Sequence, residues 1–319
     1  MKAIIHHKYG LNGLKLEDVE KPIPAADEVL VRVRASSVNP AEWYAAMSAV
    51  IMRPMMGMVK PKNPRIGTDF AGVVEAVGAA VKDFRPGDEV YGGRTGAYAD
   101  YVSVRKAISP KSVNLTFEQA AALPTAAITA LQGLRDHGKL QPGQKVLING
   151  ASGGVGTFAI QIANLGAEVT AVCSTDKVEI AHSLGADRVV DYTKEDFTRI
   201  GERYDLFLDI AGGRTWSACR RVLKPDSIFV IVGAQKKNRI LGPLGGIVRL
   251  RLGALRASQK IVFFIASFNR EDFATLTELV EAGKVTPVID RTYPLDQIRD
   301  AMRYLGQGHA KGKIIVTVP

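Results

Sequence analysis

The chain has 319 residues, roughly twice the ~150 residues that are commonest for one domain, so its length predicts two domains. Hydrophobic residues make up 46% and charged residues 23% of the chain, which excludes an intrinsically disordered, collagen-like or mucin-like protein. The formal net charge is +10, and most of the excess lies between Ser227 and Arg270, where eight Lys and Arg residues occur without any Asp or Glu. No nucleic-acid-binding module accompanies this segment, so we expect no nucleic-acid partner.

The sequence contains no run of about 18 uncharged apolar residues, so it predicts no membrane-spanning helix. The N-terminus begins with strand-like alternation and has the features of neither a signal peptide nor a transit peptide, which predicts a cytoplasmic location. The two cysteines, Cys173 and Cys219, are expected to be reduced. Together with five scattered histidines they do not form a zinc-binding pattern, so we expect no metal.

The first 120 residues predict a β-rich domain. Short strands are expected over residues 28–35, 70–77, 88–91 and 98–104, and Gly- and Pro-containing turns separate them.

From residue 144 onwards the pattern changes to alternating strands and helices. Strands are expected over residues 145–149, 168–172, 188–191, 204–210 and 227–232, with helices between them that include a polar helix between 191 and 204 and another over 215–223. Apolar strands separated by helices are typical of a parallel sheet covered on both faces, so the fold class is α/β with a Rossmann doubly wound sheet. A strand over 260–264, a helix over 271–282 and strands over 288–293 and 313–318 then follow, and the last pieces are expected to return to the first domain.

A glycine-rich loop follows the strand over 145–149. It consists of Gly150, Ala151, Ser152, Gly153, Gly154, Val155 and Gly156. A glycine loop between a strand and a helix is the context of a dinucleotide-binding fingerprint, although Ala151 stands where that pattern has a glycine. Gly153 lets the backbone approach a diphosphate, and Gly156 lets the helix pack closely on the strand. The loop therefore predicts a dinucleotide site.

The end of the second strand of this domain decides which dinucleotide is bound. An NAD site usually has an acidic residue at that strand end, whereas here Val172 and Cys173 are followed by Ser174 and, three residues later, Lys177. A cation favours the 2'-phosphate of NADP(H), because each charge-assisted hydrogen bond contributes roughly 1.5–3 kcal/mol. Asp176 keeps NAD(H) open as an alternative, and Lys177 as a solvated lysine is a second one.

Further motifs occur in order along the chain. They are Gly67-Thr68-Asp69-Phe70-Ala71-Gly72-Val73-Val74, Val77-Gly78, Pro86-Gly87-Asp88-Glu89-Val90-Tyr91, Ala121-Ala122-Leu123-Pro124-Thr125 and, on the helix after the glycine loop, Gln161. With these motifs the chain resembles the medium-chain dehydrogenase/reductase superfamily, in its zinc-independent quinone oxidoreductase (zeta-crystallin-like) and enone reductase branch. The resemblance implies a GroES-like catalytic domain over 1–123 and 265–319, with a Rossmann NADP(H)-binding domain over 124–264 inserted between.

The resemblance also implies individual site residues. Asn39 and Tyr44 match catalytic positions, where either Tyr44 or water supplies a proton. Thr125 matches a threonine beside the nicotinamide, Tyr192 joins Lys177 at the 2'-phosphate, and Gly233 is expected to lie under the cofactor. The complete expected cofactor-binding set is Thr125, Ala151, Ser152, Gly153, Gly154, Val155, Gly156, Ser174, Lys177, Tyr192 and Gly233.

Zinc-dependent relatives have a Cys near residues 39–42 and a His directly after the glycine that matches Gly67. This chain has Thr68 and Asp69 after Gly67 and no cysteine before Cys173. We therefore expect an NADPH-dependent, zinc-independent enzyme that transfers hydride to a quinone or to the β-carbon of an α,β-unsaturated carbonyl. A metal-free carbonyl reductase or alcohol dehydrogenase and a catalytically silent NADPH-binding interaction or sensor protein are the alternatives.

The branch commonly dimerises through edge strands of the Rossmann domain, so the resemblance implies a homodimer, with the strands over 227–232 and 260–264 as its candidate edge strands. The basic segment 236–260 departs from the shorter family form. It is expected to be a lid over the substrate, a solvated loop or a surface that contacts an anionic membrane or partner.

Overall fold

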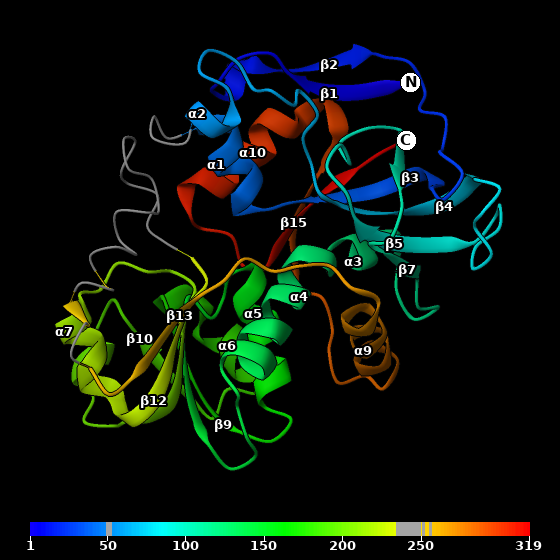
Figure 1. The fold of residues 1–319 in the computed structure, drawn as a ribbon. Coiled ribbons are helices and arrows are strands. Elements are labelled where there is room, and N and C mark those ends of the chain that lie inside the picture. Colours follow the sequence, from blue (N-terminus) through cyan, green and yellow to red (C-terminus); the bar gives the residue numbers. More distant parts are fainter. Residues whose placement is uncertain (49–52, 234–249, 251–252, 255–256) are drawn as a thin grey trace. The chain divides into compact units, whose positions relative to one another are not determined.

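The computed structural model describes residues 1–48, 53–233, 250, 253–254 and 257–319. The chain forms two compact units: unit 1 comprises Met1–Ile128 and Ser267–Pro319, and unit 2 comprises Thr129–Ala266. The domain boundaries expected from the sequence, after 123 and before 265, lie close to these divisions but do not coincide with them. Both chain termini belong to unit 1 (Figure 1).

Unit 1 is built on a mainly antiparallel sheet. Its strands follow the order β14 (Ile289–Pro294), β15 (Lys313–Thr317), β3 (Val29–Val38), β4 (Asp69–Val77), β5 (Glu89–Gly93) and β7 (Ile108–Pro110), and β6 (Tyr101–Val104) pairs with β3. A separate hairpin pairs β1 (Lys2–His6) with β2 (Leu14–Asp18). Alternate side chains of β3, among them Val29, Val31 and Val33, are fully buried in the core of this unit, as expected for a sheet with one face on the core.

Helices complete unit 1. They are α1 (Pro40–Met47), α2 (Arg53–Met56), α3 (Phe117–Ala121), α9 (Arg270–Glu281) and α10 (Ile298–Gln307), and α4 (Pro124–Gln132) runs across the division between the units. Pro40 begins α1, where a missing backbone N–H costs no hydrogen bond, and Glu42 accepts a hydrogen bond from the backbone N–H of Asn39 at 2.8 Å. No helix in the described part of the chain has the length and apolar character needed to cross a membrane.

Unit 2 contains a parallel sheet. Its strand order is β10 (Arg188–Asp191), β9 (Glu168–Cys173), β8 (Lys145–Asn149), β11 (Tyr204–Asp209), β12 (Leu223–Ile231) and β13 (Lys260–Phe263) (Figure 1). In chain order this is 3-2-1-4-5-6, the doubly wound arrangement whose direction reverses between β8 and β11. Helix α5 (Gly154–Ala163) packs on β8 and β9, and α6 (Val178–Ser183) packs on β10.

One expectation for unit 2 was wrong, and another was right only in part. The expected polar helix between 191 and 204 is a single 3-10 turn, Phe197–Arg199, in which Asp196 accepts a hydrogen bond from the backbone N–H of Thr198 at 3.1 Å. Gly201, with φ of 77°, ends this turn in a left-handed conformation. The helix expected over 215–223 is the short α7 (Trp216–Cys219) followed by a 3-10 turn, because β12 begins at Leu223. Most of the basic segment 236–260 lies outside the described residues. The hypotheses of a lid, a solvated loop or a docking surface for this segment therefore also lie outside them.

Candidate functional site

The carboxyl ends of the parallel strands lie in register along one edge of the unit 2 sheet. Asn149 pairs with Val172 on one side and with Asp209 on the other, Asp191 pairs with Cys173, and Asp209 pairs with Ile231. The expected cofactor residues of unit 2 all belong to loops or helix starts that leave this edge. In a doubly wound sheet this is the edge where ligands bind.

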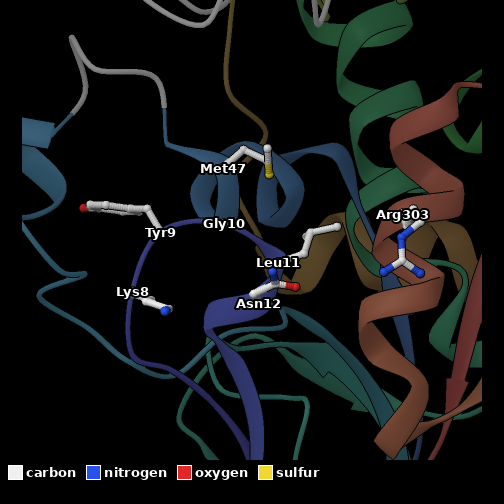
Figure 2. A pocket seen from close by; sticks show the side chains of 7 residues that line it. All are labelled: Lys8, Tyr9, Gly10, Leu11, Asn12, Met47 and Arg303. Carbon is white, nitrogen blue, oxygen red and sulfur yellow. The ribbon is translucent and has the colours of Figure 1, made fainter.

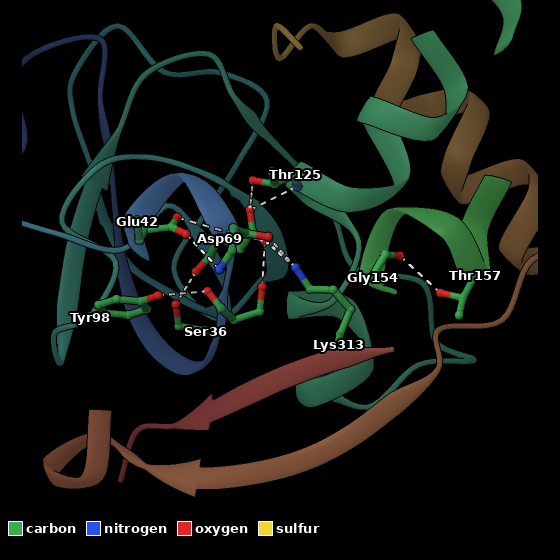
Figure 3. Close-up of polar contacts among 10 residues, drawn as sticks. Ser36, Glu42, Asp69, Tyr98, Thr125, Gly154, Thr157 and Lys313 are labelled. Atoms are coloured by element: carbon green, nitrogen blue, oxygen red, sulfur yellow. Dashed lines mark hydrogen bonds and ion pairs between the residues drawn. The ribbon is translucent and has the colours of Figure 1, made fainter. Parts of the chain in front are cut away.

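The glycine loop turns the chain from β8 into α5. Gly150 has φ of 85°, and its N–H and that of Ala151 donate to the carbonyl of Val172 at 3.2 and 3.1 Å. A Cβ on Gly156 would lie 2.3 Å from the carbonyl oxygen of Gly150, so only glycine lets α5 pack this closely on the loop. Thr157 closes the first turn by donating its hydroxyl to the carbonyl of Gly154 at 3.1 Å (Figure 3).

The loop fits a diphosphate. Gly153 precedes α5 in extended conformation, and a Cβ placed there would meet its nearest atom only at 3.6 Å, so the loop is open on that side. Residues 150–156 carry no charged side chain. The first backbone N–H groups of a helix have no partner within the helix and attract an anion, which suits the diphosphate of a dinucleotide.

The end of β9 brings together Ser174, Lys177 and Tyr192. The backbone N–H of Tyr192 donates to the carbonyl of Cys173 at 3.1 Å, which places Tyr192 directly beside the start of the Ser174 turn. Ser174 donates its hydroxyl to Asp176 at 2.6 Å. Lys177 is only 8% exposed, whereas Tyr192 is 52% exposed. A lysine and an exposed aromatic residue that follow neighbouring strand ends are residue types that suit an adenosine 2'-phosphate.

Two acidic residues at this edge were missed by the sequence analysis. Asp191 accepts hydrogen bonds from the hydroxyls of Thr175 at 2.5 Å and Thr193 at 2.7 Å, and these bonds lower the pKa of Asp191 to about 2. The carboxylate therefore ties the turn after β9 to the turn after β10. The sequence signal that could have identified Asp191 is its position at the end of the strand predicted over 188–191.

Asp209 is the second of these acids, and it is buried. It accepts hydrogen bonds from the Asn149 side chain at 2.7 Å and from the backbone N–H of Gly212 at 2.9 Å, while burial raises its pKa to about 6. Gly233 lies against the same loop, because a Cβ on it would be 2.1 Å from the carbonyl oxygen of Ile210. Asp209 thus joins the ends of β8 and β11, beside the end of β12.

Unit 1 contains a buried polar cluster where β3, β4 and β15 meet (Figure 3). Asp69 Oδ2 accepts from the Ser37 hydroxyl at 2.6 Å, from Asn39 Nδ2 at 2.9 Å and from Lys313 Nζ at 3.3 Å. Asp69 Oδ1 accepts from the backbone N–H of Thr125 at 3.0 Å and from its hydroxyl at 2.5 Å. Asp69, Asn39 and Lys313 are all buried.

The expected catalytic residues occupy different surroundings within unit 1. Asn39 donates its amide hydrogens to Asp69 and to Glu42, at 2.9 and 3.3 Å, and its Oδ1 accepts from Lys313 Nζ at 2.5 Å. The Asn39 amide is therefore engaged within the cluster. Tyr44 lies on α1 in an edge-to-face contact with Trp43, and partial burial raises the pKa of its phenol.

A pocket of about 530 Å³ lies elsewhere in unit 1, lined by residues 8–12, Met47 and Arg303 (Figure 2). It contains none of the expected site residues.

In the part of the chain that the structure describes, no group of three or more His, Cys, Asp and Glu side chains is arranged to hold a metal ion. Both cysteines are buried and unpaired with each other, as expected for reduced thiols.

Unit 2 has a doubly wound sheet with a glycine loop, and in the sequence it is inserted into the antiparallel unit 1. This combination is typical of dinucleotide-dependent oxidoreductases. Comparison with known proteins agrees with this class. Residues 25–112 match the alcohol dehydrogenase GroES-like domain, and residues 184–316 match the zinc-binding dehydrogenase family. The chain belongs to the medium-chain dehydrogenase/reductase superfamily and is an enzyme of its quinone oxidoreductase and enone reductase type.

Individual relatives cover almost the whole chain. The mouse (Mus musculus) protein NAD(P)H oxidoreductase RTN4IP1, mitochondrial, is 35% identical over 100% of this chain and 89% of its own length. The Arabidopsis thaliana NADPH-dependent alkenal/one oxidoreductase, chloroplastic, is 33% identical over 99% of this chain and 79% of its own length. The solved structure of the Coxiella burnetii quinone oxidoreductase matches with a TM-score of 0.88 and 30% identity over 100% of this chain and 99% of the other.

Proposed function

We propose that this protein is an NADPH-dependent, zinc-independent oxidoreductase that transfers hydride to a quinone or to the β-carbon of an α,β-unsaturated carbonyl. The observation that carries this proposal is the edge of the unit 2 sheet, where the glycine loop and the group of Ser174, Lys177 and Tyr192 leave neighbouring strands. The relatives named for NADPH, alkenals and quinones support the same substrates for this chain.

The preference for NADPH over NADH rests on charge. The strand β9 ends at Cys173, and the next residue is Ser174 in place of the Asp or Glu that usually accepts both ribose hydroxyls of NAD. The nearby Asp176 carboxylate accepts the Ser174 hydroxyl at 2.6 Å. Lys177 supplies a cation close to the same strand end. A 2'-phosphate bound by a cation gains roughly 1.5–3 kcal/mol per charge-assisted hydrogen bond.

The reaction needs little from the protein beyond orientation and a proton. When NADPH is bound, its nicotinamide supplies the hydride. The acceptor gains the hydride and one proton, and NADP⁺ is the second product. Tyr44 carries its proton near neutral pH, as an ordinary tyrosine does, and burial raises its pKa further. It is our proposed donor to the oxygen that gains charge, with water as the alternative source of the proton.

Zinc independence is supported by the residues themselves. A catalytic zinc site takes about three protein ligands from Cys, His, Asp and Glu. This chain has Thr68 where zinc-dependent relatives have histidine, and Asp69 is directed into the buried cluster with five hydrogen bonds. We therefore propose that the acceptor is polarised by side-chain donors.

Replacing Lys177 by alanine tests the cofactor assignment. In Lys177→Ala we expect the Kd for NADPH to rise by about tenfold or more, because the 2'-phosphate loses a cation, while the Kd for NADH changes little. Isothermal titration calorimetry measures both. Lys194→Ala is the matched control, since Lys194 lies near the same edge at 3.6 Å from Asp191 with an exposed side chain, and it should leave both affinities unchanged. Equal losses for both cofactors in Lys177→Ala would show that Lys177 does not contact the phosphate.

A further inference from the structure

The starts of three neighbouring strands in unit 2 border a second pocket, at the opposite edge of the sheet from the glycine loop. Strands β11, β12 and β13 lie side by side and are parallel, so their amino ends share one edge. β11 has six residues, which at ~3.3 Å per residue puts this edge about 16 Å from the cofactor edge. The pocket has a volume of about 350 Å³ and is lined by Arg203, Ser217, Arg220, Arg221, Leu223, Pro225, Ser258 and Gln259.

An irregularity in strand pairing accompanies this arginine pocket. The register of β12 against β11 shifts after the first residue of β12, so the stretch 224–227 does not pair with β11. In that stretch the carbonyl of Lys224 accepts hydrogen bonds from the Gln259 side-chain amide at 3.2 Å and from the Ser227 hydroxyl at 2.7 Å. The start of β12 is therefore fixed to the segment that leads into β13.

Three arginines give the pocket its charge. Arg221 is held in place, because its Nε donates to the carbonyl of Thr198 at 3.2 Å and its Nη2 donates to the hydroxyl of the same residue at 3.0 Å. These bonds use two of the five N–H groups of a guanidinium. Within the described part of the chain, the side chains of Arg203 and Arg220 form neither an ion pair nor a hydrogen bond. The pocket therefore offers several guanidinium N–H groups to a ligand.

The neighbouring carboxylates do not neutralise these arginines. Glu202 is paired with two other cations, and Asp205 is paired with Lys224 at 2.8 Å. Among the described residues Asp226 forms no ion pair. The sequence between residues 227 and 270 contains no Asp or Glu at all. The positive charge of the pocket is thus left for an anion from outside the chain.

We propose that the arginine pocket binds a phosphate group, either as inorganic phosphate or as the phosphate of a small monoester. Planar guanidinium groups bind phosphate oxygens through paired hydrogen bonds, and Ser217 and Ser258 line the same pocket with hydroxyl groups. Three cations exceed what a single carboxylate needs, whereas a phosphate carries about two negative charges. A volume of about 350 Å³ lies in the range of small-molecule pockets, which favours a small ligand over a flat macromolecular surface. This site is separate from the cofactor edge, so the inference goes beyond the proposed function and does not rest on it.

Isothermal titration calorimetry of the full chain with inorganic phosphate tests the proposal, with saturating NADP⁺ present to occupy the cofactor site. We expect phosphate to bind the natural protein, and its Kd to rise by about tenfold or more in the double variant Arg203→Gln/Arg220→Gln, because charge-assisted hydrogen bonds are lost. Both side chains are exposed, so the variant should fold. Arg199→Gln is the matched control: Arg199 follows Thr198 and is paired with Asp196 at 3.7 Å, so the Kd for phosphate should not change.

Further ligands identify the chemistry that the pocket recognises. A lower Kd for glycerol 3-phosphate than for inorganic phosphate would assign the pocket to a monoester, and a higher one would assign it to free phosphate. Acetate should bind the natural protein much more weakly than phosphate, and equal binding would contradict a phosphate site.

The natural protein and the double variant must differ for the proposal to stand. Absence of phosphate binding to the natural protein, or an equal Kd in both proteins, would overturn it. A short DNA duplex that binds the natural protein more tightly than phosphate does, and loses this affinity in the double variant, would show a nucleic-acid surface instead and would also overturn it. Failure of NADP⁺ to bind would count against the proposed function, whereas the comparison of the two proteins would still test the arginine pocket.

Discussion

Glu42 shows how burial changes the chemistry of a single residue in unit 1. It is 4% exposed, and its burial together with the nearby charge of Asp69 raises its pKa to about 7 from 4.5, against the opposing effects of the Thr68 side chain and Lys313. The folded state therefore binds this proton more tightly than the unfolded state does. The stability that the protonated group contributes is present at low pH and is lost as the pH rises through about 7.

Glu42→Gln removes this titration. The unfolding free energy of the natural protein minus that of Glu42→Gln should fall by about 2 kcal/mol between about pH 5 and about pH 7.5, since only the natural protein must ionise a buried acid. Urea unfolding followed by the fluorescence of Trp43, in a Trp216→Phe background, measures this difference for unit 1. Asp209 also titrates in this range, but it is common to both proteins and cancels. A difference that does not change with pH would contradict the raised pKa.

Residues of the candidate site could be proposed from the sequence where the pattern that marks them is local. The glycine loop and Ser174 could be assigned from short patterns that directly follow strands, and the structure places them at one sheet edge. Asp69 and Lys313 could not be assigned in this way, because their pairing spans 244 residues and nothing in either local pattern marks a buried charge. The Asn39 amide was expected as a catalytic group, and only the structure shows that its hydrogen bonds are made within the cluster.

Two glycines in the loop between β8 and α5 are expected to have different roles, one in packing and one in binding. Gly156→Ala should lower the unfolding free energy by about 1–3 kcal/mol, because its Cβ would lie 2.3 Å from a backbone oxygen. Gly153→Ala should leave stability unchanged, since its Cβ meets nothing closer than 3.6 Å, but it should weaken NADPH binding by about tenfold or more where the diphosphate approaches. Thermal unfolding and calorimetry test the pair. Unchanged NADPH affinity in Gly153→Ala would place the diphosphate elsewhere.

The strands were easier to predict than the helices. The buried strands β8 and β10 were predicted with the observed bounds, because short apolar runs between turns are typical of parallel strands. Helix α1 was missed since Asn39-Pro40 indicates a turn as readily as a helix start. Helix α10 was also missed, although its buried residues Ile298, Ala301 and Met302 have helical spacing.

We expect the protein to be a homodimer that forms through an edge strand of the unit 2 sheet. The strand over 227–232 was expected to be an edge strand, but it belongs to β12, which lies between β11 and β13. In the described sheet β13 is the outermost strand, so its other edge can accept a strand from a second copy of the chain. Light scattering of the purified protein should give twice the mass of one chain. A mass of one chain over the whole concentration range would contradict the dimer.

The cytoplasmic location stays a prediction, and the relatives quoted above from mouse and Arabidopsis are named for mitochondria and chloroplasts.

The central claim concerns hydride transfer from NADPH without zinc. The most direct measurement follows NADPH oxidation by the chelator-treated, metal-analysed protein with 1,2-naphthoquinone, 9,10-phenanthrenequinone, acrolein and 2-hexenal, using NADPH deuterated at nicotinamide C4. We predict turnover with at least one of these acceptors and, for the enals, deuterium at the β-carbon of the product. Turnover that requires stoichiometric zinc, or NADPH binding without transfer to any of these acceptors, would contradict the account.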